Sequence, residues 1–108
     1  MDTMPKRVDE NQPAIVDKLR RIPGVSVWPV HMVGKGFPDI IVGYGERNYL
    51  FEIKNPDRSL SERALTKDEQ KFFDQWNGNV NVITDAGQAW KIIEEDQRDA
   101  DPYPWPQE

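Results

Sequence analysis

The sequence contains no cysteine and one histidine, His31, among its 108 residues. The absence of cysteine excludes disulfide bonds, thiolate metal sites and cysteine nucleophiles. A single histidine is too few for a multi-histidine zinc site. If the protein is an enzyme, its chemistry must therefore come from carboxylates, lysines and hydroxyl groups.

Long apolar runs are also missing. No stretch approaches the roughly 20 apolar residues of a membrane-spanning helix, and residues 1–7 lack the apolar segment of a secretion signal. The composition is 37% hydrophobic and 31% charged, and the length suits one domain. We therefore expect a single cytoplasmic domain with no membrane association.

The net charge of -5 argues against a general nucleic-acid binder, because phosphate contacts favour a basic surface. The acidic excess is confined to the C-terminus: residues 94–108 hold six acids and one base, whereas residues 1–93 hold thirteen of each. We predict one domain over residues 1–96 and an acidic, proline-rich tail over residues 97–108. The tail is either a solvated end or a flap that competes with DNA for a basic face.

Residue periodicity predicts seven elements in the order α-β-β-β-α-β-α. The helices are expected over residues 12–22, 66–76 and 85–96, and the strands over residues 25–30, 39–43, 49–54 and 80–83. A turn at residues 44–48 joins the second and third strands, and polar loops cover residues 32–38 and 55–65. Thr66 and Glu69 have the spacing of a helix capping box. The predicted fold class is α/β, a three-layer sandwich with a mixed four-stranded sheet.

Three chemically active residues meet if the second and third strands pair. Asp39 opens one strand, and Glu52 and Lys54 close the other on one face, because side chains two apart in a strand point the same way. Two neighbouring carboxylates repel each other unless a cation lies between them. Oxygen ligands suit Mg²⁺ or Mn²⁺, and the backbone carbonyl of Ile53 is a further candidate ligand. Such an ion can bind a scissile phosphate and activate water. Lys54 is a candidate to orient or deprotonate the attacking water, or to neutralise the charge of the transition state.

Two segments, Gly36-Phe37-Pro38-Asp39 and Phe51-Glu52-Ile53-Lys54, resemble the PD-(D/E)xK nuclease superfamily. The chain is most similar to small phage and prophage VRR-NUC domains, over about residues 9–93. The resemblance implies a restriction-endonuclease-like core and metal-dependent hydrolysis of DNA phosphodiesters in a bacterial or phage-infected cell. It also implies that Asp39 and Glu52 bind Mg²⁺ or Mn²⁺, that Lys54 is the catalytic lysine and that no organic cofactor takes part.

One position departs from the family pattern. Many members carry a metal-facing glutamate in the first helix, whereas the best match here is Gln12, with Glu10 nearby. An amide is a poorer ligand than a carboxylate, so Gln12 acts through water or a DNA contact. Gln70 is a further supporting candidate, against the alternative of an exposed helix residue. His31 is either a proton shuttle or a structural residue.

Four basic residues are candidates for DNA contact. Lys35 lies between two glycines in a pliable loop. Lys18, Arg20 and Arg21 belong to the first helix. For all four, the alternative is a solvated side chain.

These observations predict a Mg²⁺- or Mn²⁺-dependent DNA endonuclease that is selective for junctions, flaps or other branched DNA and acts in DNA repair. The small size favours a homodimer. One alternative is a catalytically inactive nuclease fold that binds DNA or protein. Another is a phage accessory protein that acts through its acidic tail.

Overall fold

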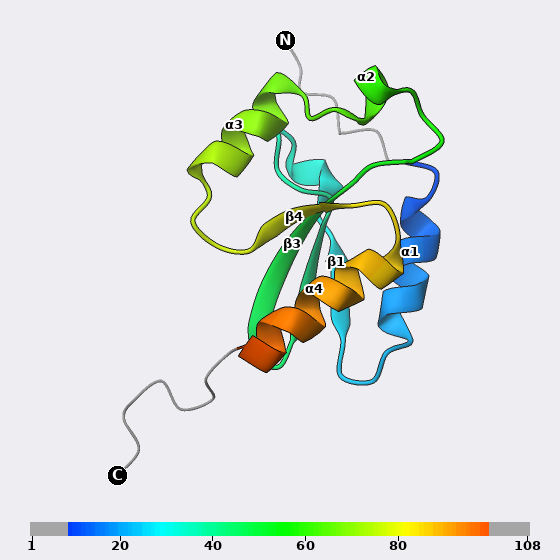
Figure 1. Ribbon diagram of the computed structural model, residues 1–108, viewed down its shortest axis with the longest axis vertical. Helices are drawn as coiled ribbons and strands as arrows, with labels where there is room; N and C mark the ends of the chain where they lie inside the picture. Colours follow the sequence, from blue (N-terminus) through cyan, green and yellow to red (C-terminus); the bar gives the residue numbers. More distant parts are fainter. Residues whose placement is uncertain (1–8, 100–108) are drawn as a thin grey trace.

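The computed structural model describes residues 9–99, which form an α/β fold around a mixed four-stranded sheet (Figure 1). The strands follow one another across the sheet in chain order: β1 (Ser26–Pro29), β2 (Ile40–Tyr44), β3 (Arg47–Ile53) and β4 (Val80–Ile83). β2 pairs antiparallel with both β1 and β3, whereas β4 runs parallel to β3. The predicted fold class is confirmed.

Helices lie on both sides of the sheet: α1 (Gln12–Arg20), α2 (Leu60–Arg63), α3 (Lys67–Gln75) and α4 (Ala86–Asp99), with a 3₁₀ turn, η1 (His31–Val33), after β1. α1 and α4 enclose the core against one face, where Leu19, Phe51 and Ile93 are fully buried. α3 lies near the end of β3 (Figure 1). No helix within residues 9–99 is both long and apolar enough to cross a bilayer.

The hairpin between β2 and β3 is tighter than predicted. β2 ends at Tyr44 and β3 begins at Arg47, so only Gly45 and Glu46 form the turn. Both have positive φ, 59° and 64°, as a type I′ turn requires. The resulting register places Ile40 opposite Phe51, so the residue before β2 lies beside the end of β3.

α4 continues to Asp99, past the predicted domain boundary at residue 96. Its last turns are held by the hairpin: Asp96 accepts hydrogen bonds from Tyr49 and Arg47, and Gln97 donates to the Tyr44 carbonyl at 2.9 Å. These contacts keep the helix intact where the composition turns acidic. The rest of the predicted tail, residues 100–108, lies outside the described residues.

Residues 55–65 were predicted to form a polar loop, but part of this segment is helical because it contains α2. Ser59 and Glu62 form a capping box in which the Ser59 hydroxyl accepts from the Glu62 N–H at 3.3 Å. The predicted capping box of Thr66 and Glu69 is confirmed at the start of α3. Before α4, Oδ1 of Asp85 accepts a hydrogen bond from the Gln88 N–H at 2.8 Å and so caps the start of this helix.

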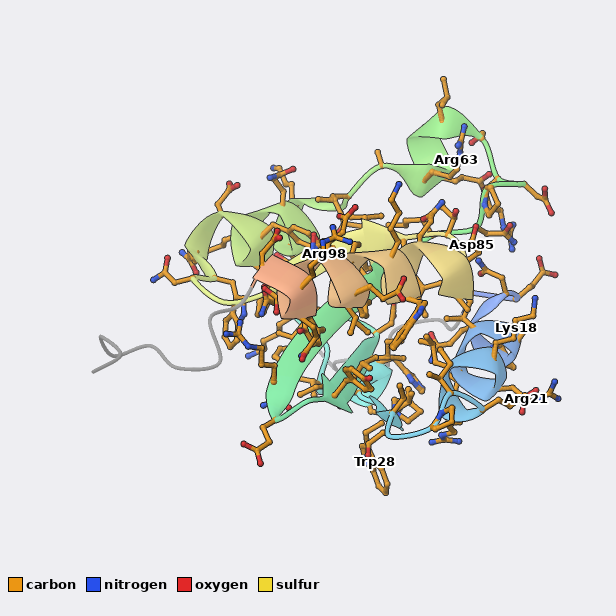
Figure 2. All side chains as sticks on the ribbon, turned by 60° about the horizontal axis from the view of Figure 1, so that its bottom comes forward. Lys18, Arg21, Trp28, Arg63, Asp85 and Arg98 are labelled. Carbon is orange, nitrogen blue, oxygen red and sulfur yellow. The ribbon has the colours of Figure 1, made fainter. Side chains whose placement is uncertain are left out.

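Part of the second sheet face is open to solvent. Trp28 of β1 is 70% exposed, and Figure 2 shows its indole extending away from the ribbon. On the same face, at the C-terminal end of β3, Glu52 and Lys54 are buried. This face of the sheet is therefore exposed at Trp28 and buried at the end that carries Glu52 and Lys54.

Candidate active site

Asp39 is fixed by hydrogen bonds to both neighbouring strands. Its N–H donates to the Phe51 carbonyl at 3.0 Å, and its carbonyl accepts from Val30 at 2.8 Å. Its side chain turns toward β3, where Oδ2 accepts from the N–H of Ile53 at 2.7 Å. Asp39 is 3% exposed. The carboxylate thus lies against the peptide that follows Glu52 and precedes Lys54.

Glu52 and Lys54 form a buried ion pair, with Nζ of Lys54 3.5 Å from Oε2 of Glu52. Their alternation along β3 places both on the face opposite Ile53, which belongs to the core. Glu52 is 1% exposed and Lys54 is 9% exposed. Charges at such depth are costly unless paired, so the ion pair offsets part of the cost of burying both side chains. The strand pairing predicted from the sequence therefore gathers Asp39, Glu52 and Lys54.

A third carboxylate, Glu69, completes the cluster and was not predicted to take part. Its Oε1 accepts from Lys54 Nζ at 2.8 Å and from the Thr66 N–H at 3.0 Å. The capping box therefore fixes the rotamer that reaches the lysine. Gln70, the residue expected to support the site, is exposed and donates to Asp74 at 2.8 Å. The signal was present in the sequence, since the third residue of a capping box turns back toward the helix start.

The loop before Asp39 packs closely on α3. Gly36 has φ of 84°, and a Cβ built on it would lie 2.2 Å from the Asp68 carbonyl oxygen. Phe37 packs edge-on against Phe72, with ring centroids 5.2 Å apart. This packing fixes α3, and with it Glu69, relative to Asp39. Lys35, a predicted DNA contact, is exposed in this loop with φ of 56°.

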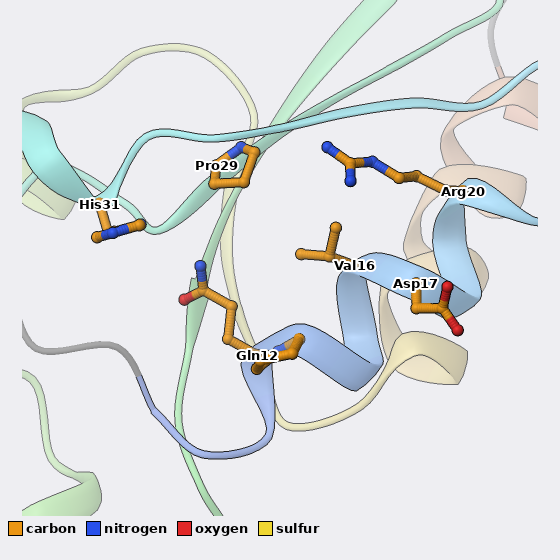
Figure 3. A pocket seen from close by; sticks show the side chains of 7 residues that line it. Gln12, Val16, Asp17, Arg20, Pro29 and His31 are labelled. Carbon is orange, nitrogen blue, oxygen red and sulfur yellow. The ribbon is translucent and has the colours of Figure 1, made fainter.

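The start of α1 adjoins the same end of the sheet. The Asn11 amide donates to the carbonyls of Lys54 and Thr84, both at 3.1 Å. Glu10 is exposed, with Oε1 3.5 Å from the Arg58 guanidinium. Gln12 is 4% exposed and lines a pocket that it shares with His31 (Figure 3). Gln12 and His31, predicted as separate supporting residues, thus belong to one cavity.

The predicted basic residues of α1 differ in their surroundings. Figure 2 shows Lys18 and Arg21 directed outward from α1. Arg21 forms a surface ion pair with Asp17 at 2.8 Å. Arg20 instead turns toward β1 and donates to the Val27 carbonyl at 3.0 Å. Lys18 and Arg21 are therefore presented to solvent, whereas Arg20 faces the pocket.

The oxygen donors fit a hydrated divalent cation. Within residues 9–99, histidine, cysteine, aspartate and glutamate side chains form no group of three or more arranged to hold a metal. Mg²⁺ is commonly bound by one or two carboxylates and retains several waters, which matches Asp39 and Glu52. A strand residue directs its N–H and C=O to the same side, so the Ile53 carbonyl points toward the side of Asp39.

Comparison of the chain with known proteins gives no independent assignment. No protein-family model matches it, and neither a curated protein nor a solved structure does.

Proposed function

We propose that the protein is a metal-dependent DNA endonuclease that hydrolyses phosphodiester bonds. One observation carries the proposal: the Asp39 carboxylate bonds to the Ile53 N–H, between Glu52 and Lys54 on the neighbouring strand. This juxtaposition supplies two carboxylates and an ammonium at one sheet end, which is the constellation of the nuclease superfamily that the sequence resembles.

Each residue has a distinct role in the proposed reaction. Asp39 and Glu52, with the Ile53 carbonyl, would hold Mg²⁺ or Mn²⁺. When bound, the cation supplies Lewis-acid stabilisation of the phosphate and lowers the pKa of a coordinated water. Lys54 contributes a positive charge that offsets the charge developing on the phosphate. The pairs with Glu52 and Glu69 keep its ammonium in a defined place.

The proposed substrate is branched or otherwise distorted DNA, bound by a homodimer. The pairing of Lys18, Arg21 and Lys35 with phosphates would be electrostatic, so binding should weaken as salt rises. Sedimentation equilibrium, with and without a four-way junction, tests the dimer directly.

Cleavage assays test the proposed activity. Labelled single-stranded, duplex, flap and junction DNA are incubated with Mg²⁺, Mn²⁺ or EDTA. We expect cutting that needs the metal and is lost in Asp39→Asn and Lys54→Met. Arg98→Ala is the matched control, because Arg98 lies on the exposed surface of α4. Failure of the folded wild type to cut any substrate would contradict the proposal.

An inactive nuclease fold that binds DNA or protein is the second candidate. It is favoured by Gln12, an amide where the resemblance implies a carboxylate. DNA binding without metal-dependent cleavage would support this candidate over the endonuclease.

A further inference from the structure

A pocket between α1 and β1 has no role in the chemistry described above. It has a volume of about 300 Å³ and is lined by Gln12, Pro13, Val16, Asp17, Arg20, Pro29 and His31. Two lining residues carry polar atoms that are buried and without a hydrogen-bond partner in the described part of the chain, Oε1 of Gln12 and Nδ1 of His31. Buried polar groups are normally satisfied, so the unsatisfied pair points to a ligand.

Figure 3 shows how the polar groups are arranged. The Gln12 amide points toward Pro29 with His31 beside it, and the Arg20 guanidinium enters from the opposite end. Arg20 is held there by its hydrogen bond to the Val27 carbonyl. Between these ends, the two prolines and Val16 provide apolar surface. The pocket thus has a polar end at Gln12 and His31, an apolar middle, and an end at the Arg20 guanidinium, where the lining carboxylate of Asp17 is paired with Arg21.

We propose that this pocket takes an unpaired nucleobase of the DNA substrate, with adenine preferred. A nucleobase has apolar faces that suit the proline and valine walls, and a polar edge that suits a carboxamide. The Gln12 amide offers one acceptor and one donor group, the pairing that glutamine makes with adenine. Arg20 is placed at the end where a phosphate of the same strand would lie, and phosphate is a favoured partner of guanidinium.

The inference rests on the proposed nuclease function and narrows its substrate class. Gln12 follows Asn11, whose side chain bonds to the Lys54 carbonyl, so the pocket adjoins the candidate active site. A base can enter only after leaving its stack, and this costs least for a nucleotide that is already unpaired. The preferred substrate is therefore DNA with an unpaired nucleotide next to the cut phosphate.

Mononucleotide binding tests the pocket independently of cleavage. Amide NMR spectra of the full chain are recorded with dAMP, and with deoxyribose 5-phosphate as the probe that lacks a base. We expect saturable shifts of the Gln12 side-chain amide and of His31 with dAMP alone. Gln12→Leu should weaken binding about tenfold, the loss of one good hydrogen bond, and Arg98→Ala on the exposed surface of α4 should not. Equal chemical-shift changes with both probes, or changes confined to residues outside the pocket, would overturn the proposed nucleobase site.

A DNA experiment tests the link to the nuclease. In EDTA, 2-aminopurine is placed next to an adenine that is either unpaired or in a matched pair. We expect the 2-aminopurine fluorescence to rise on binding only next to the unpaired adenine, because this adenine leaves the stack to enter the pocket. Gln12→Leu, confirmed as folded by its NMR spectrum, should abolish the rise. Metal-dependent cutting without this rise in fluorescence would overturn the proposed nucleobase site and would still support the proposed nuclease activity. A dAMP site in a protein that cuts no DNA would support the nucleobase site and overturn the nuclease.

Discussion

The ammonium of Lys54 lies 2.8 Å from Oε1 of Glu69, which also caps the first turn of α3. A single carboxylate thus joins the helix start to the candidate catalytic lysine. Both residues are largely buried, so the contact is shielded from the screening that weakens surface ion pairs.

The two capping boxes allow the role of Glu69 to be separated from capping. Glu69→Ala removes both the cap and a buried ion-pair partner, and we expect a loss of about 3–5 kcal/mol in the free energy of unfolding. Glu62→Ala in α2 removes only an exposed cap, and should cost about 1 kcal/mol or less. Urea denaturation measures both. Equal losses would show that the Glu69–Lys54 contact contributes nothing to stability.

Glu69→Gln keeps the capping geometry because glutamine also serves at the third position of a capping box. We expect this variant to be more stable than Glu69→Ala and to retain its secondary structure. Cleavage should nevertheless fall, since Lys54 loses one of the carboxylates that position it. We expect Glu69→Gln to lower kcat and to leave KM unchanged. The control variant Glu62→Gln should keep the kcat and KM of the wild type.

Glycine is required at position 36 because the backbone of α3 lies close to it and because its φ is 84°. A Cβ at this position would meet the Asp68 carbonyl at 2.2 Å, so Gly36→Ala must displace the loop from α3. We expect a loss of about 2–4 kcal/mol in the free energy of unfolding. Gly34 is the matched control: its φ is 76° and no atom lies within 4 Å of a built Cβ. Gly34 also has ψ of -170°, so Gly34→Ala should cost only the dihedral strain, about 1–3 kcal/mol.

Asp39→Asn tests metal binding apart from folding. The substituted amide oxygen can still accept from the Ile53 N–H, so the fold should persist, whereas Asp39→Ala leaves that N–H unsatisfied at a cost of about 1–3 kcal/mol. We expect Mg²⁺ to raise the melting temperature of the wild type, since a ligand stabilises the state that binds it. Chelation should reverse this shift, and Asp39→Asn should not show it. If Mg²⁺ raised the melting temperature of Asp39→Asn as much as that of the wild type, Asp39 would not be a metal ligand.

Tyr49 gives the fold a dependence on alkaline pH. Burial, followed by the hydrogen bond to Asp96, raises the pKa of the Tyr49 phenol above its ordinary value. The folded state therefore favours the protonated phenol, and this stabilisation is complete below the ordinary pKa of about 10 and is lost as pH rises through the raised value. Denaturation midpoints should fall above pH ~10 in the wild type and in Tyr44→Phe, but fall less in Tyr49→Phe.

Local rules were sufficient for much of the candidate site. Alternation along β3 placed Glu52 and Lys54 on one face, and the turn predicted at residues 44–48 implied that Asp39 lies beside them. Both inferences depend only on neighbours in the chain. The boundary of α4 was beyond such rules, because its last turn is held by Tyr44 and Tyr49, about fifty residues away in sequence.

The sequence by itself determined the order of the seven predicted elements, though not α2, and it determined the strand faces and the capping box that contains Glu69. Only the tertiary structure decided that Glu69, rather than Gln70, approaches Lys54, because the orientation of α3 depends on the contact of Gly36 and Phe37 with that helix. It also decided that Gln12 and His31 share one pocket. Local sequence patterns specify which side chains share a face of one helix or strand. The residue that such a side chain contacts on another element depends on how the two elements pack together.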